Sequence, residues 1–264
     1  MTAPFWAAHR QLDHRVRFDW GPTGAAAIAE GADVAVVVDV LSFTTTLCVA
    51  VERGMTVLPY RWKDDGAAAY AEERSATLAV GRLEARSLED AGGTAVSLSP
   101  GAMSRASGVD RVVLPSPNGS SIAFGLADEG CVVLGACLRN RTAVARWLHE
   151  WLDEWLDDRG GTIAVVAAGE RWPDDSLRPA VEDLWGAGSV LALLDDVTLS
   201  PEARVAADAF RAVEATLDDA LRSCASGGEL ADAGFAEDVD VAAQLDASHV
   251  VPVMDEGEFR ANLA

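Results

Sequence analysis

The sequence predicts an α/β fold in which a layered sheet, mostly parallel or mixed, is flanked by helices. Three observations support this class. Apolar runs rich in β-branched residues recur along the chain, segments with helical periodicity alternate with them, and polar turns follow them. With 264 residues the chain can bury a substantial core. We therefore expect one compact domain over residues 1–264, and an arrangement of this unit in two lobes stays open as an alternative.

The first buried strand is expected at residues 34–40, a continuous apolar run that suits a central strand covered on both faces. Helical periodicity follows over residues 44–53 and stops at Gly54, a residue that favours the end of a helix. Residues 81–108 are rich in Gly, Ser and Ala with weak periodicity, which predicts long loops around short elements. The elements expected between these two regions are a strand at 55–58, a helix at 67–74 and a strand at 77–80.

The same alternation continues through the C-terminal half of the chain. Strands are predicted at 111–114, 131–135, 162–169 and 249–253, and helices at 122–127, 142–156, 181–194 and 201–223. The last of these helices has the pattern of a long, exposed, amphipathic helix. Trp147, Trp151 and Trp155 recur at every fourth position and form one stripe, which indicates a face for core packing or for contact with a second subunit.

The charge of the chain excludes several classes of partner. Lys and Arg number 21 against 42 Asp and Glu, a formal net charge of −21, whereas nucleic acids and anionic membranes are bound by basic surfaces. No apolar run approaches the roughly 18 residues of a membrane span, and the N-terminus lacks the pattern of a secretory signal. We expect a cytoplasmic protein. Its four scattered cysteines have no zinc or redox spacing, so buried, reduced thiols are expected.

A candidate site begins where the first buried strand ends. Asp39 lies at that point and is followed by the hydroxyls of Ser42, Thr44 and Thr45 at the start of the next helix. In α/β folds, ligands bind beyond the carboxyl ends of the strands. Asp39 is therefore a candidate metal ligand or phosphoryl acceptor, with a helix cap as the structural alternative, and the hydroxyls have the same two interpretations.

A second loop of this kind is 116-SPNGSS-121, which follows the predicted strand at 111–114. Asn118 and Gly119 permit a left-handed turn, and the amides of Gly119 and Ser120 at the start of the helix could point at an anion. A simple turn is the alternative. Gly169 with Glu170 forms a third polar loop at a strand end.

The pair Glu182 and Asp183 falls in the first turns of another predicted helix. Carboxylates there interact favourably with the helix dipole, and they are also candidates for Mg²⁺ binding. No histidine lies in any of these loops, and no serine, histidine and acid order is evident. These observations favour a metal-assisted mechanism over a catalytic triad.

In their order and spacing, seven short motifs resemble the 2-phosphosulfolactate phosphatase family. They are 39-DVLSFTTTL-47, 118-NGSS-121, 166-VAAG-169, 182-ED-183, 186-GAG-188, 234-GFAEDVDVAAQLD-246 and 249-HVVPV-253, within a similarity over residues 33–254. The resemblance implies a Mg²⁺-dependent hydrolase that removes phosphate from 2-phosphosulfolactate on the route to coenzyme M. It also implies a homodimer. The site residues it implies are Asp39, Thr44, Thr45, Asn118, Gly119, Glu182 and Asp183.

Two charged positions depart from the family pattern. The first family motif carries an arginine where this chain has Ser42, and the Gly-Glu-Arg of the second motif has its glutamate replaced by Arg82. Loss of a guanidinium removes a bidentate contact for an anion. We hypothesise that Arg82 or Arg86 supplies the positive charge missing at Ser42.

These inferences predict a Mg²⁺-dependent phosphatase that acts on a small phosphorylated acid similar to 2-phosphosulfolactate. The alternative is a non-catalytic or repurposed family member that binds an anionic metabolite. Asp39 and Asn118 are the expected catalytic residues, and Mg²⁺ is expected at Asp39 with Glu182 and Asp183. The expected contacts to the substrate and its phosphate are Ser42, Thr44, Thr45, Arg82, Gly119 and Ser120.

Overall fold

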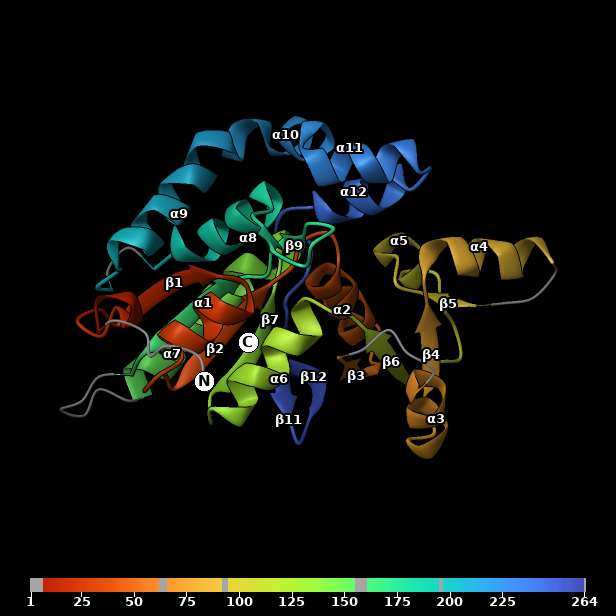
Figure 1. The fold of residues 1–264 in the computed structure, drawn as a ribbon, viewed down its shortest axis with the longest axis horizontal. Helices are drawn as coiled ribbons and strands as arrows, with labels where there is room; N and C mark the ends of the chain where they lie inside the picture. The colour runs from red at the N-terminus through yellow and green to blue at the C-terminus, as the bar shows by residue number, and fades with distance from the viewer. Residues whose placement is uncertain (1–6, 62–65, 92–94, 155–160, 195–196, 264) are drawn as a thin grey trace.

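The computed structural model describes residues 7–61, 66–91, 95–154, 161–194 and 197–263. Within them, ten strands form one mixed sheet in the order β1-β8-β2-β7-β11-β12-β3-β6-β4-β5, with helices on both faces (Figure 1). The strands of this sheet are β1 Val16–Trp20, β2 Val34–Val38, β3 Thr56–Tyr60, β4 Thr77–Val80, β5 Val96–Ser97, β6 Arg111–Pro115, β7 Val132–Ala136, β8 Ile163–Ala167, β11 Val250–Asp255 and β12 Glu258–Leu263.

The sheet has two parallel parts joined by an antiparallel hairpin. Strands β1, β8, β2 and β7 are parallel to one another, as are β3, β6, β4 and β5, and the hairpin β11–β12 connects β7 with β3. A separate pair, β9 Glu170–Arg171 and β10 Leu177–Arg178, forms a small antiparallel ribbon directly after β8. The predicted class, an α/β fold with a mixed and mostly parallel sheet, is confirmed.

The helices lie on both faces of the sheet and across one end of it. In Figure 1, α9 to α12 form an arc over the sheet, and α12 packs against α5 beside α4. The helices are α1 Gly21–Ile28, α2 Phe43–Glu52, α3 Gly66–Glu73, α4 Arg82–Asp90, α5 Pro100–Met103, α6 Gly119–Asp128, α7 Arg141–Glu154, α8 Val181–Leu191, α9 Pro201–Val213, α10 Leu217–Ser223, α11 Ala225–Asp232 and α12 Ala236–Ala242. Short 3₁₀ turns occupy Ala7–Arg10, Leu138–Asn140 and Glu214–Thr216.

Strand β2 lies at the centre of the core, as its apolar run predicts. All five residues are buried, because helices cover both faces of the sheet. Val36 and Val38 pack into the cluster that includes α7, α8 and α9, whereas Ala35 and Val37 face the cluster that includes α1, α2 and α6. The strand ends at Val38, so the next residue, Asp39, leaves the apolar core at the carboxyl edge of the sheet.

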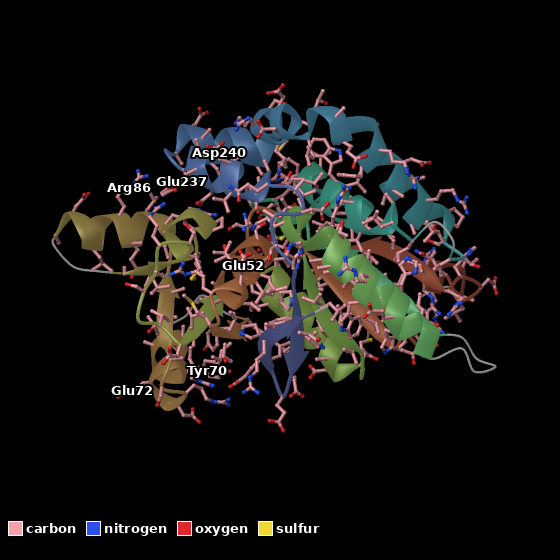
Figure 2. All side chains as sticks on the ribbon, turned by 180° about the vertical axis from the view of Figure 1, so that it is seen from behind. Glu52, Tyr70, Glu72, Arg86, Glu237 and Asp240 are labelled. Carbon is pink, nitrogen blue, oxygen red and sulfur yellow. The ribbon has the colours of Figure 1, made fainter. Side chains whose placement is uncertain are left out.

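Residues 82–90 form the helix α4, where long loops were expected. Leu83 and Leu88 of this helix are 66% and 43% exposed, and Ala85 is buried. Only three of its nine residues are apolar, so the segment has little of the apolar content that marks a helix packed against a core. Figure 2 shows Arg86 of α4 near Glu237 of α12, and both line one cavity at the junction of these helices.

The helix expected at 201–223 also differs from the prediction. It is divided into α9, a 3₁₀ turn and α10, and α9 is only partly exposed because Ala203, Ala206 and Phe210 are buried against the core. Trp147 and Trp151 pack against the same core, which assigns this part of the tryptophan stripe to packing within the chain. Trp155 lies outside the described residues.

The cysteines confirm the expectation of buried, reduced thiols, because all four are free and buried. No helix in the described ranges is both long enough and apolar enough to cross a membrane.

Candidate active site

A cavity of about 150 Å³ opens where the loops after β2, β6 and β8 meet. These are the three strand-end loops that the sequence singles out, and they approach one another although more than 100 residues separate the first from the last. Helix α4 contributes one further side chain, Arg82. The lining residues are Asp39, Leu41, Ser42, Phe43, Thr46, Arg82, Leu98, Leu114, Pro115, Ser116, Pro117, Asn118 and Glu170.

Asp39 is held at the cavity wall by backbone groups on either side of it. Its Oδ1 accepts the Phe43 N–H at 3.0 Å, in the first turn of α2. Thr44 Oγ1 accepts the Asp39 N–H at 2.9 Å and donates to the Asp39 carbonyl at 2.8 Å, so the hydroxyl fixes the backbone at Asp39. This local geometry places a nearly buried carboxylate, 7% exposed, at the start of a helix.

The electrostatic environment of Asp39 is dominated by burial and by other carboxylates. Burial, with Glu170 and Glu182 nearby, raises the pKa of Asp39 to about 7, although the N–H groups of Phe43 and Gly119 favour its ionised form. Burial likewise raises the pKa of Glu170, against the opposing charge of Arg178. The cavity therefore presents oxygen ligands in an environment that disfavours their negative charge.

Asp183 lies behind Asp39 and joins the ends of two strands. Its Oδ1 accepts the Val40 N–H at 2.7 Å and its Oδ2 accepts the Gly169 N–H at 2.8 Å. Burial and the neighbouring Asp39 carboxylate raise the pKa of Asp183 well above its usual range. Both oxygens are thus used to position the loops after β2 and β8.

Asn118 connects the loop after β6 to the loop after β8. Its Nδ2 donates to Glu170 Oε2 at 3.1 Å, and its Oδ1 accepts from Arg171 Nε at 3.2 Å. Since Asn118 and Glu170 both line the cavity, the amide orients the Glu170 carboxylate at the wall.

Gly119 is required by a close approach between α6 and α2. A Cβ at this position would lie 2.3 Å from Phe43 Cδ1 and 2.9 Å from Asp39 Oδ2, far inside normal contact distance. The Gly119 N–H donates to Ser116 Oγ at 3.1 Å and also favours the ionised Asp39. The N-terminus of α6 is therefore directed at the carboxylate of the protein itself.

Gly119→Ala is expected to lower the free energy of unfolding by about 1–3 kcal/mol, because the added methyl overpacks the contact with Phe43. Denaturant unfolding measures this. The matched control is Gly125→Ala in the same helix, where nothing lies within 4 Å of the added Cβ. The control is expected to leave stability unchanged or raise it by up to about 1 kcal/mol. Equal stability of Gly119→Ala and the wild type would contradict this packing.

The predicted site residues divide into two groups. Asp39, Ser42, Arg82 and Asn118 line the cavity. The other six lie behind its wall. The hydroxyls of Thr44, Thr45 and Ser120 donate to the carbonyls of Asp39, Val40 and Leu114, respectively. Gly119 packs on Phe43, Asp183 accepts two backbone N–H groups, and Glu182 Oε2 accepts from the Cys224 thiol at 3.6 Å. The three hydroxyls thus bind backbone carbonyls beside the site, and the N-cap residues of α2 and α6 make no side-chain cap hydrogen bond.

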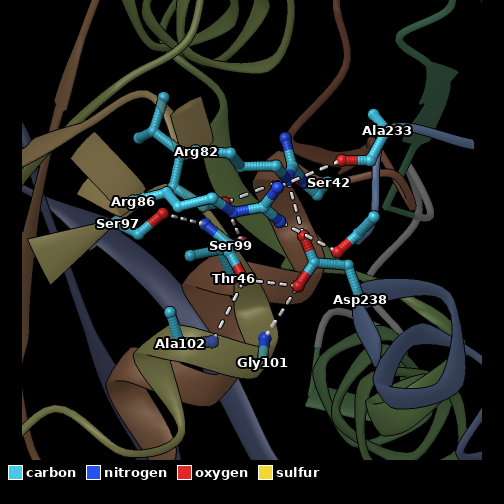
Figure 3. A network of polar contacts seen from close by, with 12 residues as sticks. Ser42, Thr46, Arg82, Arg86, Ser97, Ser99, Gly101, Ala102, Ala233 and Asp238 are labelled. Carbon is cyan, nitrogen blue, oxygen red and sulfur yellow. Dashed lines mark hydrogen bonds and ion pairs between the residues drawn. The ribbon is translucent and has the colours of Figure 1, made fainter. Parts of the chain in front are cut away.

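The two positions that depart from the family pattern are in direct contact. Arg82 Nη2 donates to Ser42 Oγ at 2.6 Å, so the guanidinium of α4 reaches the place where the family's first motif carries its arginine (Figure 3). Among the described residues that line the cavity, Arg82 alone carries a positive charge.

Two residues of the site were not among the candidates from the sequence. Glu170 lies three residues after the end of β8, and the sequence identified it only with Gly169 as a third polar loop, without a role at the site. Asp238 binds Arg82 from α12, across 156 positions of sequence, and no local pattern indicates that contact.

The donor set of the cavity suits a divalent cation that needs few protein ligands. The described residues contain no group of three or more His, Cys, Asp or Glu side chains arranged to hold a metal. Mg²⁺ is commonly held by only one or two carboxylates, with water and substrate phosphate completing its six ligands. Asp39 and Glu170, both on the cavity wall and both disfavoured as charged groups without a counterion, fit that requirement.

The sequence model of the 2-phosphosulpholactate phosphatase family matches residues 25–257. A protein of Deinococcus radiodurans named "Probable 2-phosphosulfolactate phosphatase" is 32% identical over 231 residues, which cover 86% of this chain and 89% of that protein. The "2-phosphosulfolactate phosphatase" of Methanothermobacter thermautotrophicus is 29% identical over 231 residues, which cover 87% of this chain and 90% of that protein. The family match contains every residue that lines the cavity.

Proposed function

This chain belongs to the 2-phosphosulfolactate phosphatase family, and from that premise we propose that it hydrolyses the phosphate ester of a small phosphorylated acid similar to 2-phosphosulfolactate, with Mg²⁺ as its cofactor. The products are the hydroxy acid and inorganic phosphate. The observation that carries the proposal is the Asp39 carboxylate, fixed by backbone N–H groups at the wall of a cavity of about 150 Å³. A cavity of this size suits a small metabolite.

Each residue of the site has a separate role in the proposed reaction. Asp39 and Glu170 would hold Mg²⁺, which when bound would neutralise charge on the phosphoryl oxygens as the ester bond breaks. Asn118 keeps the Glu170 carboxylate oriented through its 3.1 Å hydrogen bond. Asp183 fixes the two loops that carry Asp39 and Glu170. Arg82 supplies positive charge to an otherwise acidic cavity.

Release of inorganic phosphate from a panel of esters tests this function. The panel contains 2-phosphosulfolactate, 2-phospholactate and phosphoglycolate, which carry a second acid group, and phenyl phosphate, which does not. We expect Mg²⁺-dependent turnover, fastest on esters with the second acid group. Absence of turnover across the panel, from a protein shown to be folded by circular dichroism, would reject the phosphatase function.

A family member that binds an anionic metabolite without hydrolysing it is the second candidate. The observation that favours it is the exchange of charge at Ser42 and Arg82, which alters the anion contact of the family. Thermal unfolding separates the two functions, because a ligand that binds only the folded protein raises its melting temperature. Stabilisation by sulfate or phosphate fits both functions. The metalloenzyme also requires stabilisation by Mg²⁺ that Asp39→Ala removes, and a binder without metal does not.

A further inference from the structure

Arg82 separates two cavities at the junction of α4, α5 and α12. Its side chain lines the Asp39 cavity on one side, and on the other a cavity of about 160 Å³ that also contains Arg86, Arg105 and Asp238. The Arg82 side chain is 19% exposed, so the guanidinium is largely removed from bulk water.

Two polar contacts fix the orientation of the Arg82 guanidinium, as Figure 3 shows. Nε donates to Asp238 Oδ2 at 2.5 Å and Nη2 donates to Ser42 Oγ at 2.6 Å. The ring of Phe235 lies 5.9 Å from the guanidinium carbon and supports it from one face. Within the described part of the chain, Nη1 of Arg82 makes no hydrogen bond, so its N–H groups stay available to a ligand.

Asp238 is itself held rigidly. Its side chain is 2% exposed, and its Oδ1 accepts from the Ser99 hydroxyl and, at 3.2 Å, from the Gly101 N–H in the first turn of α5. Both carboxylate oxygens are therefore engaged, one by α5 and its cap and the other by Arg82. Through this residue α12 determines where the guanidinium of α4 points.

The lining of the Asp39 cavity carries charges of both signs: the carboxylates of Asp39 and Glu170, and the guanidinium of Arg82. A phosphorylated acid has two anionic groups, and the two carboxylates can take its phosphoryl group only together with a cation such as Mg²⁺. The other group, a carboxylate or sulfonate, matches the planar donors of an arginine.

We propose that Arg82 forms an acid-group subsite, which binds the carboxylate or sulfonate of the substrate while the phosphoryl group lies at Asp39 and Glu170. Asp238 is the positioning residue of this subsite. The inference rests on the proposed function and assigns the residues of this chain that recognise the second anionic group of the substrate. Ser42 also holds the Arg82 guanidinium, through its hydroxyl.

The readout is the ratio of kcat/KM for 2-phosphosulfolactate to kcat/KM for phenyl phosphate, measured with Mg²⁺. Arg82→Gln and Asp238→Asn are each expected to lower this ratio by about tenfold or more, the effect of weakening one charge-assisted hydrogen bond. The double variant is expected to lower it no further than Arg82→Gln alone, because Asp238 acts through Arg82. Asp238→Glu, which keeps the charge, should restore part of the ratio.

The matched control is Glu237→Gln, in the same turn of α12 with an exposed ion pair to Arg105, and its ratio is expected to stay within about twofold of the wild type. Circular dichroism and thermal unfolding establish that each variant is folded. If Asp238→Asn does not fold, Ser42→Ala removes the other hydrogen bond to the guanidinium and should lower the ratio in its place. Equal losses on both esters, or losses that multiply in the double variant, would overturn the positioning role of Asp238.

Calorimetric binding of sulfolactate, the product without its phosphate, distinguishes failure of the inference from failure of the proposed function. Arg82→Gln and Asp238→Asn are expected to weaken its affinity by about tenfold, or about 1.4 kcal/mol, and Glu237→Gln to leave it unchanged. Absence of turnover on every ester would reject the function, and Arg82-dependent binding would still support the subsite. An affinity that is the same in the wild type and in Arg82→Gln would overturn the subsite, whatever the turnover.

Discussion

Replacing Asp39 with asparagine is expected to reduce kcat for phosphate release by about 10²- to 10⁴-fold. Asparagine has the same shape and can still accept the Phe43 N–H, but it removes the negative charge that the site offers to Mg²⁺. The matched control is Asp33→Asn. Asp33 precedes the same strand, β2, at its opposite end and accepts the Thr162 N–H at 2.9 Å, so its kcat should stay within about twofold of the wild type. Comparable activity of Asp39→Asn and the wild type would contradict the placement of the site.

Without metal, Asp39→Asn is expected to be at least as stable as the wild type, although it loses activity. Burial raises the pKa of Asp39 from 3.8 in the unfolded chain to about 7, and Glu170, Glu182 and Asp183 face it. The folded state therefore binds a proton more tightly, and the wild type loses stability as pH rises from about 4 to about 7. In EDTA, the melting temperature of Asp39→Asn should match or exceed that of the wild type at pH 8, by a margin that shrinks towards pH 4. A melting temperature several degrees below the wild type at pH 8 would contradict this.

Asp183→Ala is expected to be the most destabilising of these substitutions. It removes the acceptor of two buried N–H groups, those of Val40 and Gly169, and an unsatisfied buried donor costs about 1–3 kcal/mol. We expect a loss of about 2–5 kcal/mol in the free energy of unfolding, measured with urea. Asp183→Asn should cost less, since it retains one acceptor and removes the repulsion from Asp39.

The control for this prediction is Asp174→Ala. Asp174 accepts the Ser176 N–H at 3.1 Å on the surface, where water replaces it, so its removal should leave the urea midpoint close to that of the wild type. A stable Asp183→Ala protein would contradict the structural role of Asp183. Loss of stabilisation by Mg²⁺ in a folded Asp183→Asn variant would instead support the metal-ligand role that the sequence predicts.

The location of the site follows from the sequence because its main residues obey a local rule. Asp39 and Asn118 each lie just beyond an apolar strand, and parallel strands bring such positions to one edge of a sheet. The same rule applies to Glu170 after β8, whereas Glu182 and Asp183 are predicted from their place at a helix start and from the family resemblance. Only the fold shows that Glu170 is on the cavity wall and that Asp183 faces the backbone.

The parts that the sequence does not predict depend on contacts over long distances. Helix α4 lies at the edge of the molecule, is mostly polar and leaves Leu83 and Leu88 exposed, so few apolar residues mark it in the sequence. Strand β1 contains Arg17, which is buried because its guanidinium donates to the carbonyls of Ile28 and Glu30, and this interrupts the apolar pattern of a strand. The pairing of Arg82 with Asp238 is set by the packing of α12 on α5, which no local pattern encodes.

The decisive experiment is release of inorganic phosphate from 2-phosphosulfolactate by the full chain, in Mg²⁺ and in EDTA. We expect turnover in Mg²⁺ that falls to background in EDTA and in Asp39→Asn, and that persists in Asp33→Asn. Turnover that neither EDTA nor Asp39→Asn reduces would contradict it, as would the absence of phosphate release from the folded wild-type protein in Mg²⁺.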